Sequence, residues 1–247
     1  GAAPSGRGYL AEGRLYVPLS IGEVIAFDTS NGRLASRSRS FDDQVPGNLV
    51  RCHDRILSQT ASGLWNFEPL EQRRDRIVAK LADRPNDPEL LVDHGELLLY
   101  SGKIQAAIDR LSEVLKGEAN PRASHLLSLA LVDGLHADFD TFQQRVQQLL
   151  PQLSTSKSDA SFLKELVQVY QKGGDSVGAT SACLLLASRD DELEKMEFVD
   201  SVRQIRRDRW IQTRLAQIWS AADEQTHPQL LALLNRHAEQ FEGAIDL

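Results

Sequence analysis

Cys52 and His53 are neighbours whose side chains could together ligate a metal ion. A metal site takes three or four ligands at suitable spacing, and no second cluster of such residues accompanies this pair. Because free cysteine prefers burial, we expect Cys52 in a strand core and His53 exposed beside it. The sequence also lacks the phosphate-loop, dinucleotide-binding, nucleophile-elbow and zinc-protease motifs. These observations predict no catalytic residue, no metal and no cofactor.

Two carboxylate pairs and two basic runs are the other charged clusters. Asp42-Asp43 and Asp190-Asp191 occupy loop or cap positions, where N-capping and hydration account for them. The basic runs, Arg73–Arg76 and Arg203–Arg209, each contain aspartate. Two interpretations of these runs stay open: a hydrated face with interleaved charges, or a patch that docks an acidic partner.

The composition is that of an ordinary globular protein, with 41% hydrophobic and 26% charged residues in a chain of 247. A formal net charge of −7 argues against a general nucleic-acid interface. No apolar run approaches the roughly 18 residues of a membrane-spanning helix. The stretch Gly1–Leu10 lacks the apolar core of a signal peptide, and strand-like sequence follows at once. We therefore expect a fragment of a longer protein, and its cellular compartment stays open.

Residues 1–70 read as short strands separated by turn residues. Four antiparallel strands are expected at 8–11, 14–20, 23–28 and 33–40, the last of them polar. A second group of three is expected at 47–53, 56–61 and 64–70, without a fourth. Asn31-Gly32 between two strands predicts a primed two-residue turn, in which both central residues take positive φ.

This region resembles a blade of the quinoprotein-type, or PQQ-like, β-propeller. The matching features are Gly13–Val17, Gly22, Ala26–Asp28 and Asn31-Gly32. The resemblance implies that residues 1–70 are partial propeller-type blades, the last of a propeller whose earlier part is missing. It implies a fold and not a quinone, because the family's cofactor residues cannot be mapped here and Ala35-Ser36 replaces its docking tryptophan. By the same resemblance the parent protein would be exported, to the periplasm or cell envelope.

From residue 71 the pattern becomes helical. Residues 71–87 are expected to be a linker helix, after which Asp87 caps a helix that has Pro88 at its first position. The stretch Pro88–Lys116 predicts two helices that turn at Ser101-Gly102. Neither helix can bury its apolar stripe alone, so the pair must pack on itself and on neighbours.

The hairpin resembles a tetratricopeptide repeat, a unit of about 34 residues. Its small and medium apolar consensus positions fall on Gly95, Gly102, Ala107 and Leu111. Further helix pairs are expected at 121–150, 159–188 and 192–222, with a last helix at 228–241. Turns are expected at Asp133-Gly134 and Gly173-Gly174, with Pro151 ending a helix and 152–158 as a polar loop. The expected fold class is therefore α+β multidomain, with antiparallel β blades followed by a tetratricopeptide-like helical solenoid over residues 88–247.

Tetratricopeptide arrays bind peptides on a concave surface lined by the first helix of each repeat, so the resemblance implies a peptide groove. On this register the groove residues are Glu89, Val92, Glu96, Tyr100, Lys164, Gln168 and Lys172. Chaperone-binding members clamp a C-terminal carboxylate with lysine and asparagine. Val92 and Glu96 occupy those first-repeat positions, so that clamp is not expected here.

Three functions follow as hypotheses. The first is a non-enzymatic scaffold that holds a protein or peptide partner. The second is an accessory C-terminal region of a larger quinoprotein dehydrogenase. In the third, the helical part only packs against the propeller and binds nothing.

Overall fold

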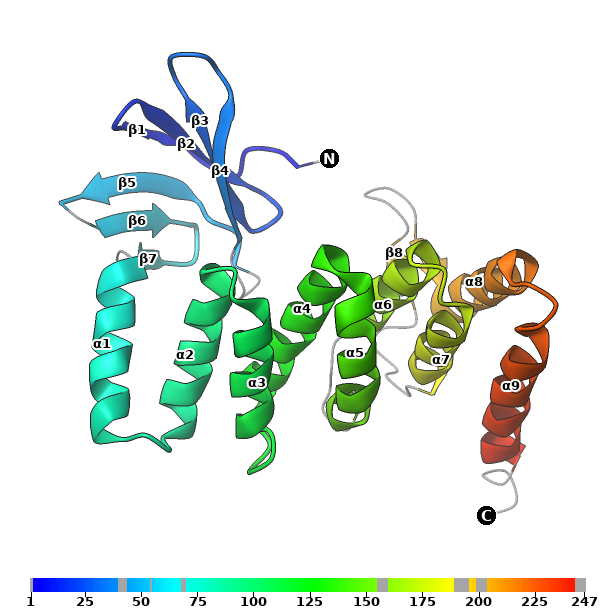
Figure 1. Ribbon diagram of the computed structural model, residues 1–247. Helices are drawn as coiled ribbons and strands as arrows, with labels where there is room; N and C mark the ends of the chain where they lie inside the picture. The colour runs from blue at the N-terminus through cyan, green and yellow to red at the C-terminus, as the bar shows by residue number, and fades with distance from the viewer. Residues whose placement is uncertain are drawn as a thin grey trace. The chain divides into compact units, whose positions relative to one another are not determined.

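The computed structural model describes residues 2–39, 44–53, 55–67, 70–154, 160–188, 196–198 and 204–242. The chain combines α-helices with small antiparallel sheets, as expected for the α+β class. It divides into two compact units, Gly1–Ser101 and Gly102–Leu247, which are described separately (Figure 1). The boundary between the units falls at the expected turn Ser101-Gly102.

The first sheet is an antiparallel meander in the order β1-β2-β3-β4, which confirms the four strands expected from the sequence. Its strands are β1 (Tyr9–Ala11), β2 (Arg14–Leu19), β3 (Glu23–Asp28) and β4 (Leu34–Arg39). The primed turn lies between β1 and β2, where Glu12 has φ 51° and Gly13 has φ 71°.

The turn expected at Asn31-Gly32 is different from the prediction. Gly32 has φ 68°, but Asn31 is not among the described residues with positive φ, so the turn is not of the primed two-residue type. The connection is longer because the Asp28 carboxylate accepts hydrogen bonds from the backbone and hydroxyl of Ser30, at 2.8 and 2.6 Å. These side-chain bonds form an Asx turn, which competes with the tight hairpin.

The second sheet has the order β5-β6-β7, and three strands are described there, as expected. They are β5 (Asn48–Cys52), β6 (Arg55–Gln59) and β7 (Leu64–Phe67). The backbone N–H of Leu49 donates to the Arg7 carbonyl at 2.8 Å, which joins β5 to the segment before β1. A Cβ at Gly47 would lie 1.9 Å from the Gln59 carbonyl oxygen, so only glycine fits this approach.

Two helices complete the first unit. They are α1 (Leu70–Asp83) and α2 (Pro88–Tyr100). The Asp87 carboxylate accepts from the backbone N–H groups of Glu89 and Leu90, which confirms the expected N-cap. The region predicted as a linker helix forms α1, which packs against α2 with Ile77 buried.

The second unit is mainly helical, and its helices pack on the next helix or on the next but one along the chain. They are α3 (Ile104–Val114), α4 (Pro121–Ala137), α5 (Phe139–Ser154), α6 (Ala160–Lys172), α7 (Ser176–Ala187), α8 (Arg207–Ala221) and α9 (His227–Glu242). Helix α4 packs against α3, α5 and α6, and helix α7 packs against α6, α8 and α9. The α6–α7 hairpin turns at Gly173-Gly174, as predicted, with Gly174 at φ 79°.

Three local predictions in this unit are wrong. Gly134 lies inside α4 rather than at a turn. The Phe142 ring packs against it so closely that a Cβ at Gly134 would lie 2.6 Å from a ring carbon. Pro151 lies within α5, which extends to Ser154. The helix expected at 192–206 is replaced in part by strands β8 (Met196–Phe198) and β9 (Gln204–Arg206), which contain the strand-favouring Phe198 and Ile205.

Candidate functional site

The predicted groove residues lie on one helix in each unit. Helix α2 of the first unit carries Glu89, Val92, Glu96 and Tyr100. Helix α6 of the second unit carries Lys164, Gln168 and Lys172. A groove that joins the two sets stays a prediction, and each set is described within its own unit.

On α2, two of the four residues are buried and two reach the surface. Val92 has no exposed surface, Glu96 is 1% exposed, and Tyr100 is 36% exposed; Glu89 is also exposed. The Glu96 carboxylate accepts a hydrogen bond from the Arg73 guanidinium of α1 at 2.5 Å. This ion pair compensates for the burial of the carboxylate and ties α1 to α2.

On α6, the three residues have different surroundings. The Lys164 ammonium lies 5.5 Å from the centre of the Trp210 ring of α8. Gln168 and Lys172 are exposed. The groove predicted from the sequence does not include Trp210, because Trp210 belongs to α8 and only helix packing brings it close to Lys164.

Of the Cys52–His53 prediction, the exposed His53 is confirmed and the buried Cys52 is wrong. Cys52 is an exposed free thiol, although burial was expected, and its Sγ lies 3.5 Å from His53 Nδ1. The reason is strand alternation: Leu49 is buried, whereas Val50 and Cys52 point to the other, exposed face of β5. Within the described ranges, no group of three or more histidine, cysteine or carboxylate residues could hold a metal ion. The pairs Asp42-Asp43 and Asp190-Asp191 lie outside those ranges.

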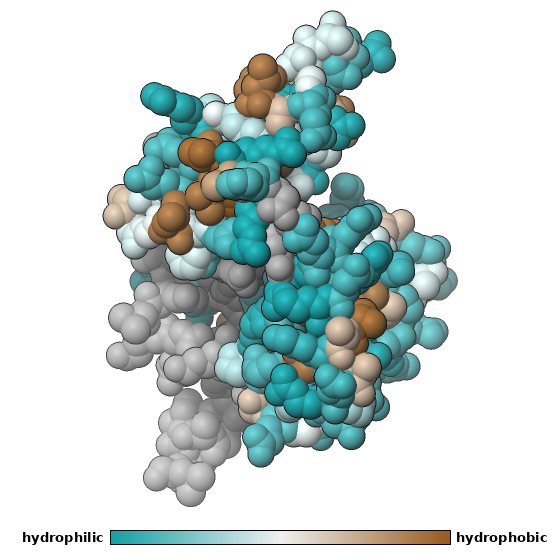
Figure 2. Space-filling view, turned by 90° about the vertical axis from the view of Figure 1, so that its left-hand side faces the viewer, coloured by the Kyte–Doolittle hydropathy of each residue, from teal (hydrophilic) through white to brown (hydrophobic). Residues whose placement is uncertain are grey.

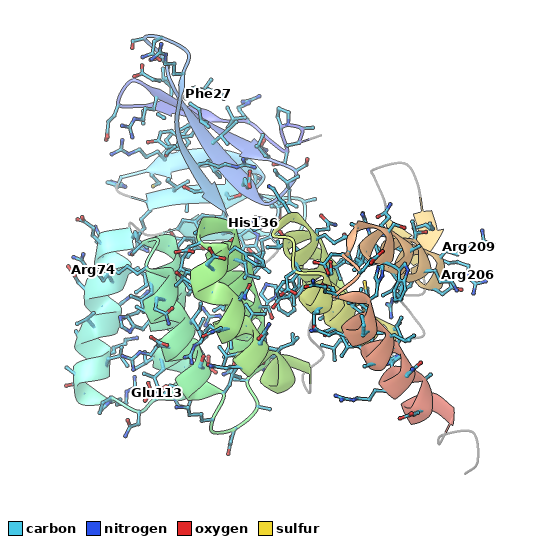
Figure 3. The ribbon with its side chains drawn as sticks, turned by 45° about the vertical axis from the view of Figure 1, so that its right-hand side comes forward. Phe27, Arg74, Glu113, His136, Arg206 and Arg209 are labelled. Carbon is cyan, nitrogen blue, oxygen red and sulfur yellow. The ribbon has the colours of Figure 1, made fainter. Side chains whose placement is uncertain are left out.

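A row of apolar side chains crosses the first sheet, one from each strand. Leu10 is opposite Leu15, Leu15 is opposite Phe27, and Phe27 is opposite Leu34. Directly opposite residues share a face of the sheet, so we name these four residues the apolar row. Leu10 is 68% exposed, Leu15 40% and Leu34 57%. Phe27, which is labelled in Figure 3, lies on β3 between Leu15 and Leu34 of the row.

The same face continues from the apolar row toward the other end of the strands. Val17 is opposite Ile25, and Ile25 is opposite Arg37. Arg37 donates to Glu23 at 2.6 Å, so this ion pair borders the apolar surface. The hydrogen bond to Glu23 raises the pKa of Arg37, which stays charged at all ordinary pH values.

The other face of the first sheet is better covered. Tyr9 and Tyr16 stack there with ring centres 4.6 Å apart, and burial raises the pKa of Tyr9. Ala26, which is opposite Tyr16, is 1% exposed. Strands β1 and β2 contact β5 of the second sheet. The face of the apolar row is thus exposed at the Leu10 and Leu34 end, whereas Leu19 and Glu23 at the other end of the same face are buried, at 8% and 9% exposed.

The second sheet also exposes large apolar side chains, which are Val50, Leu64, Trp65 and Phe67. In Figure 2, hydrophobic residues gather on the surface of the strand region. Beside Trp65 is an open pocket of about 670 Å³, with Ser5, Asn48 and Thr60 among its polar lining. Sequence reasoning recognised these strands but missed their exposed faces, because alternation does not say whether a face is covered.

The search against protein-family models and the search of curated proteins both gave no match for this chain. Among the described helices, none is both long and apolar enough to cross a membrane. The fold therefore places the chain in a general class only: a mixed α and β protein of two compact units.

Proposed function

We propose that this chain is a non-catalytic protein-interaction module, with propeller-type blades followed by a tetratricopeptide-like solenoid. The observation that carries the proposal is the exposed apolar row. Contiguous exposed apolar surface on a folded protein is typical of a surface that another protein layer covers. The succession of helix pairs supports the solenoid, since stacked pairs present extended binding surfaces.

The strand order supports the blade assignment. A propeller blade is a four-stranded antiparallel sheet, and β1–β4 form a meander of four strands. Blades pack face to face on other blades, and the first sheet already contacts the second through β1, β2 and β5. We therefore propose that a further antiparallel sheet of the same type covers the apolar row.

Self-association of the chain tests the apolar row directly. The variant with Leu15→Lys and Leu34→Lys places two charges on the row, whereas Val78→Lys changes one exposed apolar residue on α1. Sedimentation equilibrium should show concentration-dependent association of the wild type and of Val78→Lys, and a monomer for the double variant. Monomers in all three samples, with equal binding of a hydrophobic dye, would contradict a docking role for the row.

The predicted groove needs a separate test, because it lies on helices. Immobilised chain should capture a protein partner, and Tyr100→Ala and Lys164→Glu should reduce the capture. Equal capture by all variants would count against binding in the groove.

The alternative is an accessory region of a larger quinoprotein-type enzyme. The blade-like meander of β1–β4 supports the enzyme hypothesis and the scaffold hypothesis equally. The sequence of the parent protein separates the two: a complete set of blades with acidic metal ligands would favour the enzyme.

A further inference from the structure

The pocket of about 670 Å³ beside Trp65 is held in shape by hydrogen bonds to its backbone. It lies at the end of the second sheet where β6 ends and where β5 and β7 begin. Two of its lining residues, Pro46 and Gly47, are buried. The Ser5 hydroxyl donates to the Pro46 carbonyl at 2.5 Å, and the Gly47 N–H donates to the Ser58 hydroxyl at 2.9 Å. These bonds fix the segment before β5, so the pocket needs little rearrangement to accept a ligand.

The turn between β6 and β7 forms another part of the lining. The Thr60 N–H donates to the Gly63 carbonyl at 2.9 Å. The Thr60 hydroxyl oxygen accepts from the backbone N–H groups of Ser62 and Gly63, at 3.3 and 3.2 Å. Thr60 and Ser62 therefore bring two hydroxyl groups to the pocket on a fixed backbone.

The lining combines one aromatic ring with neutral polar groups. Trp65 is 41% exposed, so part of its indole ring is open to a ligand. The other polar groups of the described lining are amides and hydroxyls, from Gln44, Asn48, Gln59, Ser5, Thr60 and Ser62. Amides and hydroxyls both donate and accept hydrogen bonds. Among the lining residues that the structure describes, none has a charged side chain.

The Asn48 amide is already oriented by the chain. Its Oδ1 accepts a hydrogen bond from the Arg7 backbone N–H at 2.8 Å. The nitrogen of the same amide carries two N–H donors, which are left for a ligand within the described surroundings.

We propose that this pocket binds a neutral carbohydrate, with one sugar ring stacked on Trp65 and its hydroxyl groups bonded to the amides and hydroxyls of the lining. A sugar ring has an apolar face of C–H groups that packs on an aromatic face, and a rim of hydroxyls that need donors as well as acceptors. A purely apolar ligand would leave the polar lining without partners, which costs free energy. An ionic ligand would find no opposite charge in the described lining. The pocket is separate from the apolar row, so the inference goes beyond the proposed function and does not depend on it.

The experiment uses the whole chain and three neutral trisaccharides, which are maltotriose, cellotriose and triacetylchitotriose. The chain has three tryptophans, so its nuclear magnetic resonance spectrum contains three indole N–H signals. The signal that is missing from the spectrum of Trp65→Phe belongs to Trp65. At least one trisaccharide at millimolar concentration should shift this signal in a saturable way. Trp219 is 40% exposed, and its signal should stay in place as an internal control.

Variants measured by titration calorimetry give a graded prediction. Trp65→Ala should weaken binding about tenfold, because the stacking surface is lost, whereas Trp65→Phe keeps an aromatic face and should retain most of the affinity. Gln59→Leu should weaken binding about threefold, because it removes a hydrogen-bonding amide at similar volume. The matched control is Phe67→Ala, which removes an exposed aromatic ring of the same strand outside the described lining and should leave the affinity unchanged.

Several results would overturn the inference. They are no saturable shift with any of the trisaccharides, equal affinity of Trp65→Ala and the wild type, equal shifts of Trp65 and Trp219, or tighter binding of the anionic trigalacturonate than of the neutral sugars. Circular dichroism of each variant shows that the fold is retained. The Leu15→Lys and Leu34→Lys variant should still bind the sugar, and Trp65→Ala should still self-associate. A failure of the pocket is therefore distinguishable from a failure of the apolar row.

Discussion

The strands and the helices of this protein differ in how far their apolar side chains are buried. Among the described residues, the large side chains that are fully buried belong to helices, as Leu131, Leu166 and Tyr170 show. The strands leave Leu10 and Leu64 exposed by 68% and 65%. Both regions are rich in apolar residues, so composition does not explain the contrast.

The number of neighbours explains it. Helix α4 is covered by α3, α5 and α6, so its apolar residues are buried from several sides. A small sheet is a single layer, and each of its faces needs a second layer before it becomes a core. On the first sheet, Leu10, Leu15 and Leu34 of the apolar row stay exposed, although Leu19 and Glu23 farther along the same face are buried. The contrast teaches that the helices bury their large apolar side chains in shared cores, whereas the strands leave several of theirs exposed.

The largest expected effect on stability comes from truncating one leucine in a helix and one in a strand. Leu166 is fully buried in α6, and Leu64 is 65% exposed on β7. Leu166→Ala should lower the free energy of unfolding by about 2–5 kcal/mol, because it removes contacts and leaves a cavity. Leu64→Ala should change it by no more than about 0.5 kcal/mol. Urea denaturation followed by circular dichroism measures both, and similar losses would break the comparison.

Two ion pairs of the first unit give the next contrast. The Glu96 side chain is 2% exposed, and its partner Arg73 is 25% exposed. Arg73→Leu should lower the free energy of unfolding by about 3 kcal/mol, because a buried carboxylate loses its compensating charge. Arg37→Leu should cost less, because Arg37 is 58% exposed and water can take its place beside Glu23.

A double variant is the control for the ion pair. Arg73→Leu combined with Glu96→Leu removes both charges and should recover much of the stability that Arg73→Leu loses. Urea denaturation of the single and double variants measures this coupling. A loss in the double variant equal to the sum of the two single losses would show that the pair is not coupled.

Two glycines offer a smaller effect. Gly134→Ala would bring a Cβ to 2.6 Å from the Phe142 ring, whereas a Cβ at Gly63 meets no described atom within 4 Å. Overpacking costs about 1–3 kcal/mol, and the better helix propensity of alanine returns about 1 kcal/mol. Gly134→Ala should therefore destabilise the second unit by about 1 kcal/mol and Gly63→Ala should be nearly neutral. In a Phe142→Leu background the loss at Gly134 should disappear, as thermal denaturation can show.

The smallest expected effects concern the two cysteines, their reactivity and the pH dependence of stability. Cys52 is exposed and should react with a thiol reagent in the native protein, whereas the fully buried Cys183 should react only after unfolding. The folded state holds the Cys183 proton with a pKa of about 12 against an ordinary value of 9.0. Unfolding therefore releases this proton more readily as the pH rises above about 9, so stability should fall between pH 9 and 12. Reaction of both thiols in the native chain would contradict the first claim. A flat pH profile of stability in the wild type, indistinguishable from that of Cys183→Ser, would contradict the second.

Local signals succeeded for the strands, for one helix cap and for one helix turn, but they failed at Asn31-Gly32, where Asp28 forms an Asx turn. The seven strands of residues 1–70, the Asp87 cap of α2 and the Gly173-Gly174 turn of α6–α7 were all predicted. They follow from alternation, capping and positive φ, which act over a few residues. The helix predicted at 192–206 is wrong where β8 and β9 form, because Phe198 and Ile205 favour strands.

Contacts with other elements explain why three further predictions differ from the structure. Glycine is common in turns, so the sequence predicts a turn at Gly134. Gly134 instead lies within α4, where the absence of a side chain leaves room for the Phe142 ring. Cys52 was assigned to a core, but its face of β5 is exposed. The seven groove residues were chosen by their position in a repeat, which could not show that Val92 is buried or that Lys164 lies over Trp210.

The amino-acid sequence by itself determined where the strands and most of the helices form, since periodicity and turn residues act locally. Only the tertiary structure decided which apolar faces are covered and which cation lies over the Trp210 ring. Leu15 and Leu131 both follow the correct period for their elements, yet one is 40% exposed and the other has no exposed surface. The physical reason is that burial depends on the layer that packs above a residue, and that layer comes from distant parts of the chain.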